Sequence, residues 1–412
     1  MDLLTLVEHR PRLAVPLSAE QRDTLRRLLP SLAVSPTQGR EGCYDLTPGS
    51  VVGALTLPGL AVEIRPKIDL GNVLFLLSYA LDPRAWRSLP FAFGASADSL
   101  PEAMAQAFLL QLRRAFRRGV LQGYRSEEAA LPCLRGRIRL DDHLRRRFGL
   151  MPPLEVRYDE YTEDIEPNRI LRAALDRLER LRLSLEDTRR GLRRLRGTLE
   201  RVTLRHYSPS QLPEIAWDRL NQHYRGAVEL ARFILRSAAF DLAHGRVAAS
   251  AFLLDMNEVF EVFVHTALGE SLSLSPRAFP RAAAGHLLCL DHGRAIRLEP
   301  DLSWWEGPTC VFVGDVKYKR TTAAGVNHPD LYQLLAYTIA AGLSHGLLVY
   351  AAGEGEPVAH EVVDLGKRLE VYSLDLSGPP QAILAEVGSL AEQIRRLRTN
   401  PGGPVAPSEC AG

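Results

Sequence analysis

Lysine is scarce in this chain. It occurs only at Lys67, Lys317, Lys319 and Lys367, although Lys and Arg together number 51. Arginine therefore serves wherever a plain positive charge is enough. A lysine that is retained in such a chain indicates a position that needs a compact ammonium group or an adjustable pKa, which arginine does not provide.

Cysteines and long apolar runs are also sparse. The five cysteines are scattered and match no zinc motif, which excludes a cysteine-based metal site and is typical of a reducing compartment. The most apolar stretch, 331–352, contains Gln333, Ser344 and His345 and favours a helix, a turn and a strand over a membrane span. Residues 1–10 lack the apolar core of a signal peptide. We therefore expect a cytoplasmic protein with no membrane contact.

A phosphate-binding loop is absent as well. The pattern Gly-x-x-x-x-Gly-Lys-Ser/Thr occurs nowhere, and the one Gly-Lys pair, Gly366-Lys367, is followed by Arg368. In that pattern the backbone N–H groups and the lysine hold the phosphates of a nucleotide. Any nucleoside triphosphate hydrolysis connected with this chain must therefore come from a partner.

The positive charge that is present is unevenly distributed. The net charge is +2, yet Arg113–Arg205 holds 24 Arg, no Lys and 15 acidic residues, so this segment has a surplus of nine positive charges. Two interpretations stay open. The segment is a surface that meets phosphates, or it consists of solvated helix faces on which arginines pair with acidic neighbours.

The spacing of apolar residues divides the chain into four regions. Residues 1–95 are predicted to form a β-rich domain, 96–245 an Arg-rich and mostly helical region, and 246–398 a mixed α/β domain. Residues 399–412 are rich in Pro, Gly and Ser and are expected to be disordered. The expected fold class is therefore a multidomain α+β or α/β protein.

Local signals place individual elements. Ser18 is expected to cap a helix that runs to Leu32, and Pro58-Gly59 is expected to join two strands as a hairpin. In the last region we expect the order α-β-β-β-α-β-β. The remaining elements that matter below are helices over Pro213–Leu242, Ala251–Leu268 and His328–Ala341, a short hairpin around Asp291-His292-Gly293, and a strand over Cys310–Lys317.

The clearest chemistry belongs to Asp301, Asp315 and Lys317. Asp315 and Lys317 are two apart on a predicted strand and so point to the same face. Asp301 follows Pro300 at the end of the preceding hairpin strand, so we expect both carboxylates to converge on one cation. Mg²⁺ prefers oxygen ligands and keeps several waters, so two or three carboxylates are enough. Lys317 is expected to orient the attacking water or to stabilise the charge that develops on a phosphate.

Three further side chains are candidates for the same site. Glu258 and Glu261 are three apart on a predicted helix, share one face, and either can supply a third carboxylate. Gln333, on the helix that follows the lysine strand, is a candidate for positioning the water or Lys317. Simpler interpretations stay open: a solvated Glu258, and a structural salt bridge within Asp315-Val316-Lys317.

This order of elements resembles the PD-(D/E)XK nuclease superfamily, in which a helix with Glu precedes Pro-Asp, an Asp-x-Lys strand and a helix with Gln. More specifically, the chain looks like the McrC family, the nuclease subunits of McrBC-type 5-methylcytosine restriction systems. The resemblance extends over most of the chain and rests on Ile64–Ile68, Leu134–Ile138, Asp159–Asp164, Pro167–Leu171, Met256–Val264 and Asp315–Lys319.

The resemblance implies a restriction-endonuclease-like domain that cuts double-stranded DNA with Mg²⁺ or Mn²⁺. Asp301, Asp315 and Glu261 would be its metal ligands, with Glu258 as the alternate, and Lys317 and Gln333 would complete the catalytic set.

The same resemblance implies a partner, an AAA+ GTPase that recognises modified cytosine and whose GTP hydrolysis this subunit stimulates. Docking would use the N-terminal part of the chain, with Arg65 and Lys67 as candidate contacts, and a structural role for the Pro66 segment stays equally open. Two other functions stay open: a regulatory subunit with a degenerate nuclease fold, and a standalone repair-type nuclease. A neighbouring gene for an AAA+ GTPase would distinguish them.

Overall fold

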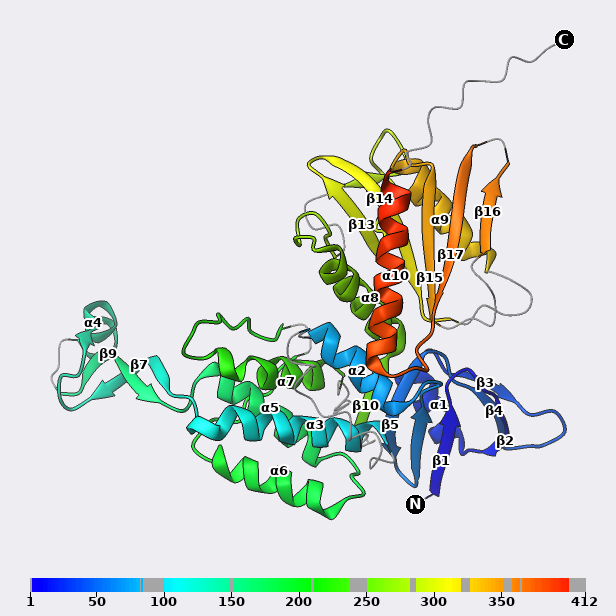
Figure 1. Cartoon of the computed structure of the whole chain (residues 1–412). Helices are drawn as coiled ribbons and strands as arrows, with labels where there is room; N and C mark the ends of the chain where they lie inside the picture. Colours follow the sequence, from blue (N-terminus) through cyan, green and yellow to red (C-terminus); the bar gives the residue numbers. More distant parts are fainter. Residues whose placement is uncertain are drawn as a thin grey trace, which may run out of the picture. The chain divides into compact units, whose positions relative to one another are not determined.

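The computed structural model describes residues 2–81, 83, 99–148, 152–208, 211–237, 250–281, 287–319, 327–351, 358–363 and 365–399. Over these residues the chain is a mixture of helices and small sheets, as expected (Figure 1). Within them, no helix combines the length and apolar character that a membrane crossing needs. The predicted disorder of the tail concerns residues that, apart from Thr399, lie outside the described part.

The chain divides into two compact units. The first holds the described parts of Met1–Leu4, Gly53–Val62 and Ala97–Leu253, and the second those of Thr5–Val52, Glu63–Ser96 and Leu254–Gly412. The division expected from the sequence, with boundaries near 95 and 245, stays a prediction about domains. The second unit nevertheless joins much of the first expected region to most of the third.

A five-stranded mixed sheet forms the centre of the second unit. Its order is β13-β14-β15-β17-β16, with β14, β15 and β17 parallel to one another and β13 and β16 antiparallel to their neighbours. The strands are β13 (Leu302–Glu306), β14 (Thr309–Lys317), β15 (His345–Ala351), β16 (Val358–Val362) and β17 (Lys367–Leu374). The predicted strand over Cys310–Lys317 is thus confirmed as part of β14.

Helices cover both faces of this sheet. In Figure 1, α10 (Pro380–Thr399) lies in front of the strands and α9 (His328–Ala340) behind them. Leu334 of α9 packs with Leu348 and Tyr350 of β15, which point to the same side of the sheet. The predicted helix over 328–341 is therefore confirmed, whereas α10 was not predicted.

The helix expected over Ala251–Leu268 is wrong at its start. Ser250–Asp255 forms strand β10, and α8 runs from Met256 to Leu272. Asp255 sets the boundary, because its side chain accepts a hydrogen bond from the Asn257 backbone N–H and so caps the helix. The apolar residues before Asp255 fit a strand as well as a helix, which is why their pattern did not locate the start.

The remaining elements of the second unit are small. Ser18 caps α1 (Ala19–Leu28) with a capping box, so the helix begins as predicted but ends before Leu32. The predicted hairpin around residues 291–293 is confirmed by paired strands, although its expected start at His286 lies outside the described residues. The elements are α2 (Leu70–Leu81), a sheet of order β2-β4-β3 made by Arg12–Pro16, Cys43–Thr47 and Ala33–Pro36, and the pair β11 (Leu288–Cys289) and β12 (Arg297–Leu298).

The predicted hairpin strands near residues 51–65 are neighbours in a four-stranded sheet of order β1-β6-β5-β10. Gly59, in the turn, has φ +76, a conformation that glycine adopts at little cost. The strands are β1 (Asp2–Val7), β5 (Val51–Leu57), β6 (Leu60–Arg65) and β10.

The first unit is mostly helical. Next to its helices stands a three-stranded sheet of order β7-β9-β8 with α4 (Figure 1). The elements are α3 (Leu100–Ala115), η3 (Phe116–Arg118), β7 (Gly123–Leu131), β8 (Arg137–Ile138), α4 (Leu140–Arg147), β9 (Leu154–Thr162), α5 (Glu166–Glu179), α6 (Glu186–Thr198), η5 (Gln222–Tyr224) and α7 (Arg225–Ser237).

The helix expected over Pro213–Leu242 is wrong over its first third, because α7 begins only at Arg225. Asp218 explains the difference. Its side chain accepts hydrogen bonds from the backbone N–H groups of Leu220 and Asn221 and so stabilises a turn in place of a helix. Residue 242 lies outside the described residues.

Many arginines of this unit form ion pairs with acidic neighbours. On α6, Glu186 pairs with Arg189, Arg190 and Arg193. Asp164 receives hydrogen bonds from Arg169, which keep its pKa well below the ordinary range. On α6 these pairs are exposed, as the interpretation of solvated and paired helix faces predicts, whereas Asp164 and Arg169 are paired but largely buried.

The contact between α9 and β15 yields a stability prediction. A Cβ at Gly346 would overlap Thr338 Oγ1 and lie 3.0 Å from Leu334 Cδ1, both on α9. We expect Gly346→Ala to lower the free energy of unfolding by roughly 1–3 kcal/mol, because the helix must move away from the sheet. In α10, Gly388 has open space around it, and Gly388→Ala should raise that free energy by about 0.5–1 kcal/mol. Chemical denaturation of both variants measures this. Equal changes in the free energy of unfolding for the two variants would contradict the close packing of α9 against Gly346.

Candidate active site

Strand β14 brings the central residues of the site together. Asp315 and Lys317 lie on one face of this strand, as expected. Leu302 of β13 is paired with Gly314, so Asp301, one residue earlier, comes opposite Asp315 in the antiparallel register. The pairing of β13 with β14 therefore places both carboxylates at the same end of the sheet.

The contacts of these three residues are short. Lys317 Nζ lies 2.7 Å from Asp315 Oδ2 and 3.9 Å from Asp301 Oδ2. Asp301 Oδ2 also accepts a hydrogen bond of 2.9 Å from the Val316 backbone N–H. Asp315 has no exposed surface, and neither of its carboxylate oxygens accepts a hydrogen bond of good geometry from a described residue.

The burial of Asp315 changes its protonation. Burial and then the charge of the neighbouring Asp301 raise the pKa of Asp315 and Lys317 lowers it, which together bring this pKa to about 7. Burial by itself would lower the pKa of Lys317, but the attraction of Asp315 and Asp301 outweighs it, so that pKa lies above its ordinary value. The site therefore holds the poorly solvated carboxylate of Asp315 beside the charged ammonium group of Lys317.

Of the two helix carboxylates, Glu261 faces this site. Burial raises the pKa of Glu261 and the charge of Asp301 raises it further, whereas Arg281, 3.8 Å away, lowers it. Glu258 is exposed in the first turn of α8. Among the two alternatives for a third carboxylate, the structure therefore favours Glu261.

Gln333 lies beside the site, but its side chain forms a hydrogen bond with a tyrosine and not with the residues of the site. Its side chain is exposed, and Nε2 donates a hydrogen bond of 2.7 Å to the hydroxyl of Tyr337, one turn further along α9. The Tyr337 hydroxyl donates to the Glu299 carbonyl at 3.2 Å. Burial raises the pKa of Tyr337, and the charge of Asp315 adds to this effect. Tyr337 is thus the aromatic neighbour of the two carboxylates.

A second polar cluster lies at the end of β14. Lys319 pairs with the buried Asp330 at 3.2 Å, and Tyr350, the register partner of Lys317 on β15, donates to Asp330 at 2.8 Å. Burial raises the pKa of Tyr350, and its hydrogen bond to Asp330 raises it further. This cluster holds the start of α9 against the strands that carry the site.

Lys67, a candidate for partner docking, lies against the end of the same strand. Its ammonium group donates to the Tyr318 carbonyl at 3.2 Å and lies 3.7 Å from the centre of the Tyr318 ring. Glu8 completes the contact, because its carboxylate accepts hydrogen bonds from the Lys67 backbone N–H and the Tyr318 hydroxyl. Arg65, the other docking candidate, is exposed and pairs with Glu63.

Tyr337, Asp330 and Glu8 were not predicted from the sequence. Tyr337 had a usable signal, since it follows Gln333 by four residues and so shares its helix face. Glu8 had none, because its partners lie about 60 and 310 residues away along the chain.

The oxygen ligands present fit a small hard cation. Within the described residues, no three His, Cys, Asp or Glu side chains form a ready cluster for a metal ion, and Glu261 is paired with Arg281. The set of Asp301, Asp315 and Glu261 is therefore not assembled as a triad, and its role stays a prediction. Two carboxylates, one buried without hydrogen bonds, are nevertheless sufficient for Mg²⁺ that keeps its waters.

Comparison with known proteins gives one family and two similar structures. A family model described as McrBC 5-methylcytosine restriction system component matches residues 46–351. A chain of the refined half-complex from the tetradecameric assembly of Thermococcus gammatolerans McrB AAA+ hexamers with bound McrC is similar in fold. The TM-score is 0.58 at 17% identity, over 94% of this chain and 100% of that one.

The second structure is the cryo-EM structure of the Thermococcus gammatolerans McrBC complex. A chain of it matches with a TM-score of 0.44 and 19% identity, over 66% of this chain and 88% of that one. No curated protein matches the sequence.

The contact of Glu8 with Lys67 and Tyr318 gives a pH prediction. Burial raises the pKa of Glu8 to about 7, whereas an unfolded glutamate has a pKa near 4.3. The folded chain then holds this proton more tightly than the unfolded chain, so Glu8 costs stability as pH rises from about 4.5 to 7. The Glu8→Gln variant lacks this titration. Its free energy of unfolding, relative to the wild type, should grow by roughly 2–3 kcal/mol between pH 5 and pH 8.

Denaturant titrations at several pH values measure this difference. Glu20→Gln, at an exposed position on α1, is the control and makes the same chemical change away from this contact. A difference for Glu8→Gln that does not change with pH would show that Glu8 is not held in the buried contact.

Proposed function

This chain belongs to the family of McrBC 5-methylcytosine restriction system components, and from that membership we propose that it is the nuclease subunit of such a system. In this proposal it cuts phosphodiester bonds of double-stranded DNA, and its catalytic centre is built on Asp301, Asp315 and Lys317. The family match covers residues 46–351, which include the Lys67 segment and the strand that carries Asp315 and Lys317.

One observation carries the proposal. Asp315 is fully buried, its oxygens accept no hydrogen bond of good geometry from a described residue, and it lies opposite Asp301 with Lys317 alongside. An unsolvated carboxylate costs stability and is retained where it has a functional use. The mixed sheet with helices on both faces agrees with a PD-(D/E)XK nuclease domain, since the three residues lie together where β13 begins and β14 ends.

Mg²⁺, or Mn²⁺, would be held by Asp301 and Asp315, with Glu261 as a further ligand. When bound, such an ion lowers the pKa of a coordinated water and stabilises charge on the phosphate. Asp315 supplies a buried carboxylate whose Oδ2 is paired with Lys317, and Asp301 is fixed by the Val316 N–H. Lys317 places its ammonium group beside both carboxylates, where it can orient the attacking water and offset charge on the scissile phosphate.

The remaining residues have supporting roles in this proposal. Gln333 donates to Tyr337, which orients that hydroxyl near Asp315. Their contact makes Gln333 a positioning residue rather than one that touches the reacting atoms in this arrangement.

The proposed partner is an AAA+ GTPase. The structure that this chain resembles in fold contains McrB AAA+ hexamers with bound McrC, and this sequence has no phosphate-binding loop of its own. We propose that the N-terminal part docks to such a partner and stimulates its GTP hydrolysis, and that the partner recognises the modified cytosine.

The decisive test is cleavage of methylated and unmethylated plasmid by this chain, with and without the GTPase, in Mg²⁺ with GTP and in EDTA. Cutting that needs both Mg²⁺ and the partner supports the proposal. Cutting by the chain alone would indicate a standalone nuclease. Stimulated GTP hydrolysis without any cutting would indicate a regulatory subunit.

Asp315→Asn separates a catalytic role from a structural one. We expect cleavage to fall by at least about 100-fold while stimulation of the GTPase is kept, because the charge that holds the metal is lost. The melting temperature should stay the same or rise, because the variant no longer buries an unsolvated carboxylate. Asp330→Asn is the matched control for stability. It removes a buried carboxylate that Lys319 and Tyr350 do bind, so it should lower the melting temperature. A similar loss in Asp315→Asn would make Asp315 structural.

Lys317→Arg tests the need for an ammonium group. The planar guanidinium is larger and has a fixed donor geometry, so it does not fit between two carboxylates that lie 2.7 and 3.9 Å from Lys317 Nζ. We expect a loss of cleavage of at least about 10-fold, measured as the initial rate of plasmid nicking. Lys367→Arg makes the same change at a lysine that donates to the Leu343 carbonyl, away from the site, and should cut at the wild-type rate. Full activity of Lys317→Arg would remove Lys317 from the catalytic set.

A further inference from the structure

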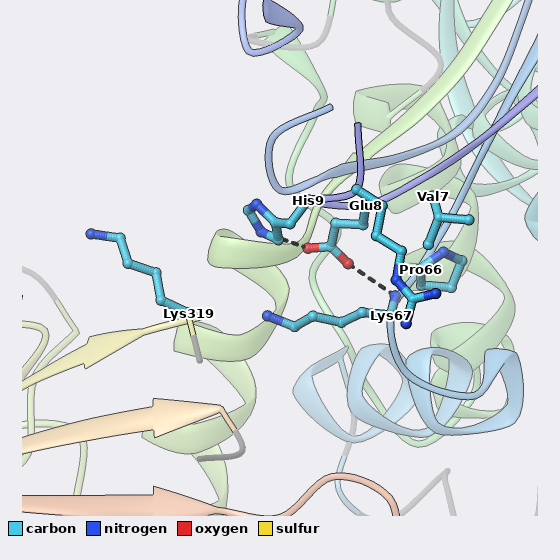
Figure 2. Close-up of a pocket in the computed structure, with 7 residues that line it drawn as sticks. Val7, Glu8, His9, Pro66, Lys67 and Lys319 are labelled. Atoms are coloured by element: carbon cyan, nitrogen blue, oxygen red, sulfur yellow. Dashed lines mark hydrogen bonds and ion pairs between the residues drawn. The ribbon is translucent and has the colours of Figure 1, made fainter. Parts of the chain in front are cut away.

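A cavity of about 640 Å³ lies beside the end of strand β14. Three segments far apart in the sequence line it: Val7–Arg10, Pro66-Lys67 and Lys319. Figure 2 shows Lys67 extending toward Lys319, with Glu8 between the His9 ring and the Lys67 backbone. The volume is in the range of sites that bind small molecules or segments of larger ones.

The cavity wall is cationic. Arg10, Lys67 and Lys319 contribute three positive charges. Arg10 is exposed, and within the described residues no acidic side chain pairs with it. The one carboxylate of the wall, Glu8, is already used: it accepts hydrogen bonds from Lys67 and Tyr318 and lies 3.3 Å from His9 Nε2. Its raised pKa further reduces its negative charge near neutral pH. Lys319 is also paired, with Asp330 at 3.2 Å, but its side chain remains 45% exposed. The wall therefore presents more positive than negative charge to an anion.

The cavity adjoins the candidate active site through the chain itself. Lys319 follows Lys317 by two residues, and the Tyr318 between them is the residue that Lys67 and Glu8 hold. Three of the four lysines of the sequence, Lys67, Lys317 and Lys319, thus gather around the end of one strand. Lysine binds phosphate as a compact point charge, and arginine adds a bidentate fork.

We propose that this cavity binds a backbone phosphate of the DNA strand that is cut at Asp301, Asp315 and Lys317. The inference rests on the proposed function and extends it, because two of the three cations come from the N-terminal part of the chain. That part then contributes to holding the substrate in addition to any docking of a partner. Arg10 makes the contact that can be removed without loss of a structural partner, whereas Lys67 also supports Tyr318 and Lys319 also pairs with Asp330.

The test is the salt dependence of DNA binding by the full chain. Fluorescence anisotropy with a labelled duplex of about 30 base pairs, in EDTA to prevent cutting, gives the slope of log K against log salt, and each phosphate contact contributes about −0.9 to it. Arg10→Ala and Lys319→Ala should each make the slope shallower by about 0.9 and weaken binding about 5- to 10-fold at 0.1 M salt. The matched control is Arg40→Ala, at an exposed position in the same unit that does not line the cavity. It should leave the slope unchanged, and the melting temperatures of all variants verify folding.

The outcomes separate this inference from the proposed function. If the wild type binds duplex and both variants bind with its slope, the cavity holds no phosphate, and the nuclease proposal is untouched. If all three variants lose the same amount of DNA affinity and of slope, the effect is one of net charge and the cavity is likewise excluded as a phosphate site. If the wild-type chain binds no duplex, the cavity proposal fails. Plasmid cutting in the complex then decides whether the nuclease proposal fails with it.

Discussion

The arrangement of this site depends on one buried carboxylate. Asp315 lies inside the central sheet without a hydrogen bond of good geometry from any described residue, and the nearby ammonium of Lys317 is its main compensation. A charge in this position costs free energy that the neighbouring elements must offset. Strand β14 can carry it because α9 and α10 cover the two faces of the sheet and pack a large apolar surface against it. The apolar packing thus holds in place a group that by itself would favour solvent.

The sequence predicted the parts of this site that are local. Two residues of spacing put Asp315 and Lys317 on one face of a strand, and the short connection from β13 to β14 brought Asp301 opposite them. The strands and helices around residues 309–351 were predicted for the same reason, since their apolar periods are clear. The boundaries that failed, at Met256 and Arg225, depend on single side chains, Asp255 and Asp218, that compete with the apolar pattern for the backbone N–H groups.

What the sequence did not predict is long-range. Glu8 and Lys67 meet Tyr318 across about 250 to 310 residues of chain, and no periodicity or motif links positions so far apart. Lys67 was therefore interpreted only through the family resemblance, as a candidate docking contact. In the fold Lys67 also supports the end of the strand that carries the site, because the N-terminal segments and this strand belong to one compact unit. The division into consecutive regions hid that relation, since it assumed that neighbours in sequence share a unit.

The scarcity of lysine has a practical consequence for labelling chemistry. In most proteins, reagents that acylate ε-amino groups modify many scattered positions, and the products are heterogeneous. This chain offers four such groups, of which Lys67, Lys317 and Lys319 lie around one strand end, while the fourth donates to the Leu343 carbonyl. An amine-selective crosslinker therefore behaves here as a site-directed reagent. Whatever macromolecule occupies that strand end can be captured in place and identified from a few peptides.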